Sequence, residues 1–163
     1  MSESIQLIPE KIHIQRIKIL AGNITSDPSI KDESVENYNV QYAIDDGFNS
    51  ESKTFRFVLS TRIDALGKED VDIGISAEYQ IEYIFYVENL EYYLIRDDDK
   101  VEQFVIHDIL IHALLGMVYS TSRGIILGRT QGTSMDGVIL PVIDTRALMT
   151  NLQGNRSPEE AGR

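Results

Sequence analysis

Three groups of side chains have residue types that can do chemistry. His107 next to Asp108 is a potential general base, but no nucleophile can be assigned beside it. His107 and His112 are five residues apart, which puts them on different faces of a helix, whereas paired metal ligands on a helix are three or four residues apart. The acidic run at residues 97–99 lacks the ligand spacing of a calcium loop and is most simply a solvated turn. We therefore predict no metal site.

Other catalytic signatures are missing from the sequence. It contains neither a glycine-rich phosphate-binding loop nor a zinc-binding helix motif. It also contains no cysteine, which excludes disulfides, thiol catalysis and thiolate metal sites. We therefore expect a protein that is not an enzyme and needs no cofactor.

Composition and charge narrow the class of protein further. A chain of 163 residues is long enough for one domain with an apolar core. Its formal net charge of -11 disfavours nucleic acid, which demands clustered Lys and Arg, and instead keeps the protein soluble or attracts a basic partner. The longest apolar stretch, Phe104–Tyr119, is shorter than the about 20 residues that span a membrane. The N-terminus also lacks a signal-peptide pattern, so we expect a cytoplasmic protein without membrane insertion.

Alternating apolar and polar residues predict the first elements of the fold. The predicted strands cover residues 12–20, 38–44, 55–64 and 75–87. The triplet Asp45-Asp46-Gly47 is a strong turn signal after the second of these strands. Residues 92–95 form a short additional segment.

From Val101 onward the apolar period is that of a helix, which we expect to extend to Ser122 with Gly124 as its C-terminal cap. Glycines then predict a flexible loop, followed by a second, shorter helix at residues 144–152. Four strands followed by two helices predict an α+β fold, in which a four-stranded antiparallel sheet precedes one long and one short C-terminal helix. Residues 1–153 would form a single domain, and residues 154–163 a disordered polar tail.

The apolar arc of the long helix is wider than one core contact needs. One face can cover the sheet, and the other would then pack against a second copy of the chain. The predicted interface residues are Ile109, Leu110, Leu114 and Val118. The alternative is that the whole arc is intramolecular core.

The chain contains eight tyrosines, several of them near the fourth strand. Tyrosine offers a large contact area at a low cost in side-chain entropy, which suits a surface that binds many sequences. The alternative is that aromatic residues are simply favourable in strands.

Four sequence pieces, in the right order, resemble the SecB family of protein-export chaperones. Ile14-Gln15-Arg16-Ile17 followed by Asn23-Ile24-Thr25 is similar to the first strand of that family. In the long helix, Asp108-Ile109-Leu110-Ile111 is similar to the family's Asn-Ile-Leu-Phe, and Ser122-Arg123-Gly124 matches its Ser-Arg-Gly. Pro141-Val142, Ala147-Leu148-Met149 and Leu152-Gln153 resemble its tail helix.

This resemblance implies a homotetramer, a dimer of dimers with the long helices in the middle. It implies a holdase that binds unfolded preproteins in apolar grooves and passes them to the translocase motor ATPase, without covalent chemistry. By position, the client-binding side chains would be Tyr42, Phe55, Phe57, Tyr83, Phe85, Leu148 and Leu152.

The sequence also departs from the family. The stretch His107–His112 lacks the family's prolines, and a longer glycine-bearing loop, Leu127–Leu140, replaces its usual connection. Asn23 stands where the family carries an aspartate that contacts the motor, and Asp27 would stand for its glutamate, so both are predicted partner-docking residues on an acidic surface.

These departures leave three alternatives to a general export chaperone. The first is a chaperone dedicated to one partner, such as the antitoxin of a toxin–antitoxin system. The second is an interaction module whose tyrosine-rich face binds one folded partner, and the third is an enzyme.

Overall fold

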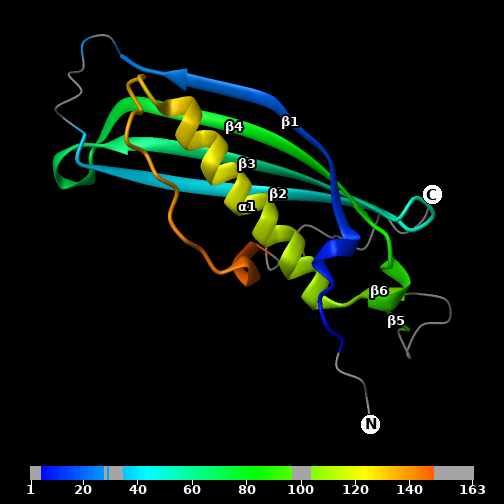
Figure 1. Cartoon of the computed structure of the whole chain (residues 1–163). Coiled ribbons are helices and arrows are strands. Elements are labelled where there is room, and N and C mark those ends of the chain that lie inside the picture. Colours follow the sequence, from blue (N-terminus) through cyan, green and yellow to red (C-terminus); the bar gives the residue numbers. More distant parts are fainter. Residues whose placement is uncertain (1–4, 28, 30–34, 97–103, 149–163) are drawn as a thin grey trace, which may run out of the picture.

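Four long strands form one antiparallel sheet in the order β1-β4-β3-β2. They are β1 (Ile12–Thr25), β2 (Asn37–Asn49), β3 (Thr54–Leu66) and β4 (Asp72–Val87) (Figure 1). This computed structural model describes residues 5–27, 29, 35–96 and 104–148. Short 3-10 helices η1 (Pro9–Lys11), η3 (Lys68–Asp70) and η4 (Leu90–Tyr93) lie at strand ends. The α+β fold class predicted from the sequence is confirmed.

The strand β2 is longer than the sequence pattern predicts. The predicted turn Asp45-Asp46-Gly47 is wrong, because these residues lie inside β2 and pair with Val58, Phe57 and Arg56 of β3. The ladder to β3, and the packing of Phe48 on Phe55 with ring centroids 4.8 Å apart, outweigh the local turn preference. The chain turns instead between Asn49 and Thr54, where Lys53 has a left-handed φ of 56°.

The long helix α1 (Asp108–Thr130) crosses one face of the sheet, which we call the inner face (Figure 1). It begins later than predicted: His107 is its N-cap, and its ring Nδ1 accepts a hydrogen bond from the Ile109 N–H at 3.1 Å. The helix also passes through Gly124, so the predicted C-terminal cap is wrong. Ile126 continues the apolar face beyond Gly124 and is buried, which favours further helix over a stop.

The region before α1 differs from the predicted helix as well. Phe104–Ile106 forms a short strand, β6, that pairs with β5 (Leu94–Arg96) in a separate two-stranded sheet. Residues 101–103, which the sequence assigned to the start of the long helix, lie outside the described residues.

After α1 the chain reverses and runs back beside the helix without joining a sheet (Figure 1). We call residues 131–144 the return segment. Residues 145–148 are helical, and Asp144 caps them by accepting a hydrogen bond from the Arg146 N–H at 2.9 Å. The predicted second helix therefore begins where expected, whereas residues 149–152 and the predicted tail lie outside the described residues.

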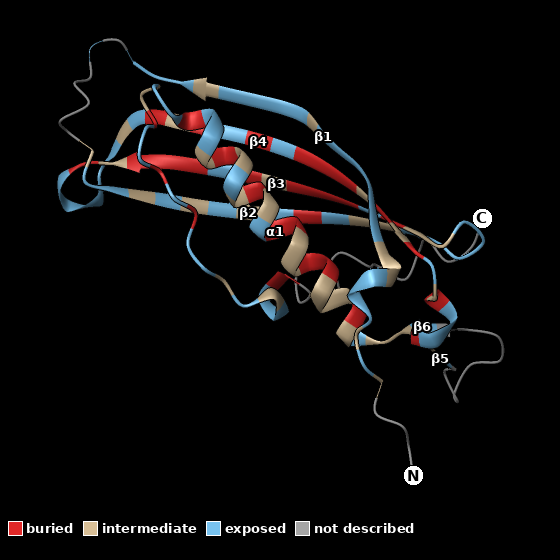
Figure 2. Cartoon of the chain, in the orientation of Figure 1, coloured by how far each residue is buried: buried red, intermediate tan, exposed pale blue. Residues whose placement is uncertain are grey.

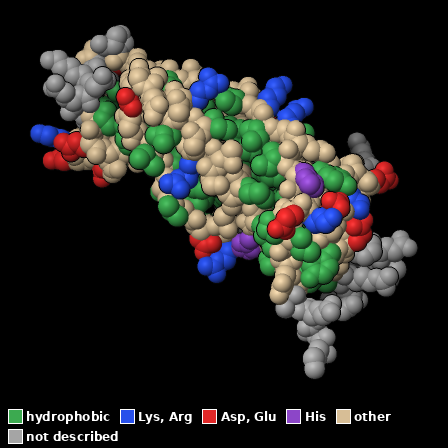
Figure 3. All heavy atoms as spheres, in the orientation of Figure 1, with side chains coloured by type: hydrophobic (Ala, Val, Ile, Leu, Met, Phe, Trp, Pro, Cys, Tyr) green, Lys and Arg blue, Asp and Glu red, His purple; other side chains and the backbone are tan. Residues whose placement is uncertain are grey.

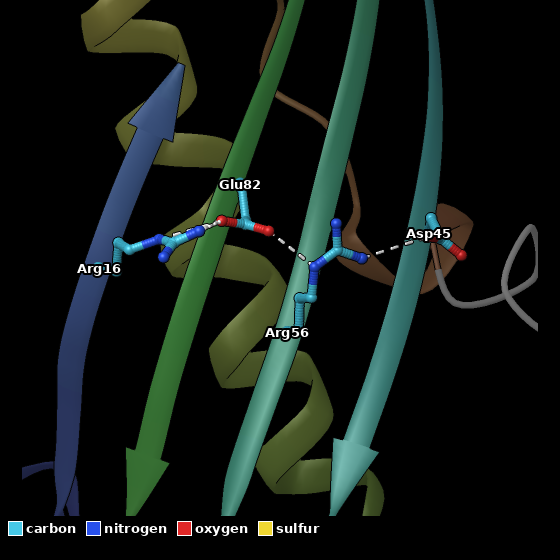
Figure 4. A network of polar contacts seen from close by, with 4 residues as sticks. All are labelled: Arg16, Asp45, Arg56 and Glu82. Atoms are coloured by element: carbon cyan, nitrogen blue, oxygen red, sulfur yellow. Dashed lines mark hydrogen bonds and ion pairs between the residues drawn. The ribbon is translucent and has the colours of Figure 1, made fainter. Parts of the chain in front are cut away.

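The two faces of the sheet differ in chemistry. The apolar residues of β3 and β4 alternate into the inner face, which α1 and the return segment cover (Figure 2). On the outer face an ionic network crosses all four strands, from Arg16 through Glu82 and Arg56 to Asp45 (Figure 4). The Arg56 and Arg16 guanidinium groups, bonded to the Glu82 carboxylate, hold the pKa of Glu82 below its ordinary value.

Candidate functional site

The return segment contacts both α1 and the edge strand β2. Side chains of α1 bond the backbone carbonyl oxygens of the return segment. The Tyr119 hydroxyl donates a hydrogen bond to the carbonyl oxygen of Pro141 at 2.7 Å. One turn along the helix, Arg123 Nε donates to the carbonyl oxygen of Leu140 at 2.9 Å. The Tyr42 ring packs edge-on against Tyr119 with centroids 5.6 Å apart, so β2 and α1 meet at this point.

A third contact of the same kind comes from β2. The Tyr38 hydroxyl donates to the carbonyl oxygen of Asp136 at 3.4 Å. Burial raises the pKa of Tyr38 and, more strongly, that of Tyr119, where the adjacent Tyr42 adds to the effect. Both phenols therefore stay protonated at physiological pH and remain hydrogen-bond donors.

Three side chains of the return segment enter the core, and buried and exposed side chains alternate only from Val138 to Pro141. Met135, Val138 and Leu140 are at most 1% exposed and belong to the main core. Ile139 and Val142 point the other way and are 64% and 83% exposed, the largest values among the exposed large apolar side chains of the described chain. Figure 3 shows hydrophobic side chains reaching the surface on this side of the molecule. Exposed apolar side chains thus lie beside side chains that bond the backbone carbonyls of Leu140 and Pro141, and we call this strip of surface along α1, β2 and the return segment the groove.

The predicted client-binding residues of β3 and β4 share the inner face, and most of the described ones are covered. Five of them are at most 2% exposed: Phe55, Phe57, Tyr83, Phe85 and Leu148. In this conformation they are core rather than an open surface, because the alternating pattern that identifies an apolar face does not reveal what covers it. Tyr42 is half-buried and lies at the groove, and Leu152 lies outside the described residues.

The predicted interface residues also fill the core. Leu110, Leu114 and Val118 are fully buried within the chain itself, so they cannot contact a second copy unless α1 moves. For these three side chains the alternative, intramolecular core, describes the structure. Ile109 is only half-buried and packs at the edge of this core.

The two predicted docking residues are exposed at one end of β1. Asn23 pairs with Glu78 of β4, and Asp27 follows the end of the strand. Hydrogen bonds from the Ser29 hydroxyl and N–H lower the pKa of Asp27, so this carboxylate carries its charge at neutral pH.

The edge strand β1 carries an exposed apolar stretch that was not predicted from the sequence. Ile14, Ile17 and Leu20 are all between 41% and 48% exposed, and in the described chain β1 pairs only with β4. Two register shifts interrupt that pairing, next to Ile14 and Ile19. The high isoleucine content of residues 12–20 was the available signal, but a single chain gives no indication that the strand stays uncovered.

Two hollows complete the surface. One, of about 420 Å³, crosses the outer face where four residues lie opposite one another on the four strands: Ala43, Ser60, Gln80 and Ala21. The other, of about 330 Å³, lies between β1 and the C-terminal end of α1 and includes Ile19, Tyr79 and Arg129. Among the described residues, no three His, Asp or Glu side chains are arranged to hold a metal ion.

No family model and no curated protein matches the sequence. The structure, however, is similar to that of the SecB-like chaperone Rv1957 of Mycobacterium tuberculosis, solved in complex with a ChAD peptide from the antitoxin HigA1. The similarity has a TM-score of 0.58 at 11% sequence identity, and covers 83% of this chain and 92% of the other. The fold is that of a SecB-like chaperone. This agrees with the resemblance found in the sequence, and the low identity fits a divergent SecB-like chain.

The SecB-like fold also accounts for the hydrophobicity of α1. This helix is long and apolar enough to cross a membrane by length and composition alone, a property that it shares with core helices of soluble proteins. Here its buried side chains pack on the inner face of the sheet.

Proposed function

We propose that this protein is a molecular chaperone that holds extended apolar segments of non-native polypeptides in the groove between α1, β2 and the return segment. The observation that carries the proposal is the exposure of Ile139 and Val142 beside Tyr119 and Arg123, which bond backbone carbonyls. Apolar contacts with backbone hydrogen bonds bind extended chains with little sequence demand. The SecB-like fold supports the same role, which is one of binding rather than catalysis.

The free energy for holding a client comes mainly from apolar burial. Each Å² of apolar surface removed from water contributes about 25 cal/mol, so a segment covering several exposed apolar side chains is held without a nucleotide. The edge strand β2 adds unpaired backbone groups along the same groove, which an extended client can bond.

A dedicated client is the second candidate. The structural neighbour was solved with a peptide from an antitoxin, so a single partner of that kind fits the SecB-like fold as well as a range of preproteins does. Purifying the protein from its native cells with its bound polypeptides separates the two: one dominant client favours the dedicated role, and many clients favour the general one.

We further propose that the chain self-associates as a dimer of dimers in the cytoplasm. The support is the uncovered edge of β1, where Ile14, Ile17 and Leu20 would be buried by a second copy, together with the half-buried Ile109. Delivery of preproteins to the translocase motor ATPase would use the exposed end of β1 with Asn23 and Asp27. Mass measurement in solution tests the assembly, and a monomer would contradict it.

Suppression of aggregation by an unfolded model protein tests the chaperone function. We expect the wild-type protein, in excess, to keep the model protein soluble. The double substitution Ile139→Asp with Val142→Asp should abolish this, because two charges would enter the apolar groove. The matched control is Val71→Asp, which changes an equally apolar side chain, 60% exposed, in the turn between β3 and β4. Equal suppression by all three proteins would place binding elsewhere, and no suppression by the wild type would contradict the chaperone function.

A further inference from the structure

The central part of the return segment is held differently from every strand of the sheet. Residues 139–143 make no backbone–backbone hydrogen bond to any other described residue. Their attachment consists of the buried Leu140, the half-buried Ile143, and side-chain donors from Tyr119 and Arg123 to two of their carbonyl oxygens. An extended segment without a ladder can leave its position without breaking secondary structure.

The hydrogen bonds to the return segment do not depend on its side chains. Tyr119, Arg123 and Tyr38 all donate to backbone carbonyl oxygens, which every polypeptide carries. The specific part is the spacing of the buried side chains, since Val138 and Leu140 are two residues apart and both face inward, as in any extended chain. A client with apolar side chains at alternate positions matches this arrangement.

We propose that the return segment is an internal ligand, which occupies the client site and is displaced by the client. The inference rests on the proposed function and specifies its site: the client takes over the carbonyl contacts of Leu140 and Pro141 and the apolar positions of Val138 and Leu140, while the displaced segment stays against the client through Ile139 and Val142. The preferred client is an extended segment with apolar residues at alternate positions.

The backbone supplies a hinge for this exchange. Gly132 and Gly137 have φ values of +73° and +87°, a region that other residues rarely adopt, and a Cβ at either position would lie in open space. The glycine positions themselves are therefore not packed against a neighbour, and movement of the segment costs the burial of Val138 and Leu140. Displacement exchanges one set of apolar contacts for another, so the apparent affinity for a client is the intrinsic affinity reduced by the fraction of molecules whose site is free.

A disulfide between α1 and the far end of the return segment tests the proposal. A Cβ built at Gly116 lies 3.9 Å from Thr145 Cγ2, which places these two positions side by side for the pair Gly116→Cys and Thr145→Cys, and the chain has no other cysteine. The disulfide ties Thr145, five residues after Leu140, to α1 and so restricts how far residues 139–143 can move away from the helix. The probe is a labelled peptide with the sequence of residues 133–144, and the control peptide carries Asp at the positions of Val138 and Leu140.

We expect the oxidised variant to bind the probe at least about tenfold more weakly than the same variant after reduction. Weakening the internal ligand should do the opposite: Val138→Ala with Leu140→Ala in the protein should raise the apparent affinity. Equal binding by the oxidised and reduced forms would overturn the displacement mechanism while leaving the chaperone function intact.

Thiol labelling provides a readout that needs no client. A cysteine replacing Leu140 should react with a thiol reagent in the native state much faster than one replacing Leu114, although both side chains are at most 1% exposed. Equally slow labelling would show that the return segment does not open and would overturn the proposal, even if no peptide bound to any form. Fast labelling without peptide binding would instead contradict the proposed function.

Discussion

The inner face of the sheet packs against α1 through apolar side chains, whereas the outer face is open to solvent and is crossed by ion pairs and by a shallow hollow. Both faces are made by the same strands, through the alternation of side chains along each strand. The inner face contributes most of the folding free energy and, at its margin by β2, the proposed surface for binding. The outer face mainly fixes the register of the strands. If this division is right, substitutions on the two faces should differ in size and in kind.

The largest expected effect is truncation in the centre of the inner face. Phe57 is 1% exposed and packs against Phe55 and Phe85. Phe57→Ala should lower the free energy of unfolding by about 3–5 kcal/mol, because it removes apolar burial and leaves a cavity. Urea denaturation measures the change. The matched control is Val58→Ala on the neighbouring outer position, and a loss as large as that of Phe57→Ala would contradict the comparison.

A smaller loss of stability is expected at a polar contact between the inner face of the sheet and the middle of α1. The Tyr83 hydroxyl and Ser122 Oγ are 2.6 Å apart, and both side chains are fully buried. Tyr83→Phe leaves the serine hydroxyl unpaired and should cost about 1–3 kcal/mol. Adding Ser122→Ala removes the unpaired group, so the double variant should regain part of the loss. A double variant less stable than Tyr83→Phe in denaturant unfolding would show that the hydroxyls are not a simple pair.

On the outer face, Glu82→Gln should lower stability less, because Arg16 and Arg56 are about half exposed and can turn to water. The pKa of Glu82 is lowered in the folded state. The stability it contributes is therefore present above the pKa of the unfolded chain and is lost as the pH falls through the lower folded-state pKa. The wild type and Glu82→Gln should differ at neutral pH and converge in acid. Thermal unfolding across pH measures this, and a constant difference would contradict the ionic origin.

The features of the two faces that depend on local periodicity were predictable from the sequence. The sequence pattern identifies all four strands, and alternating residues identify the apolar sides of β3 and β4, since a period of two is a property of each strand alone. The turn at Asp45-Asp46-Gly47 and the cap at Gly124 were wrong for one reason: pairing with β3 and the burial of Ile126 outweigh a local preference.

The candidate site was less accessible to sequence reasoning. Tyr42 could be predicted as a site residue from the strand that carries it. The position of the return segment, however, depends on contacts between residues distant in the chain, such as Tyr119 with Pro141. No local sequence pattern in residues 131–144 indicates that they lie beside α1. For the same reason Phe55 and Tyr83 were expected at a binding surface, although the chain itself covers them.

The smallest expected effect concerns the hollow on the outer face, which is the obvious competitor for client binding. Ala43 is exposed at one end of the hollow, and a glutamine side chain there would partly fill it without entering the core. Ala43→Gln should change the free energy of unfolding by no more than about 0.5 kcal/mol. It should also leave aggregation suppression unchanged, because clients bind on the other face. A variant that folds normally but no longer suppresses aggregation would move the client site to the outer face, and the exposed Ile139 and Val142 would then need another occupant.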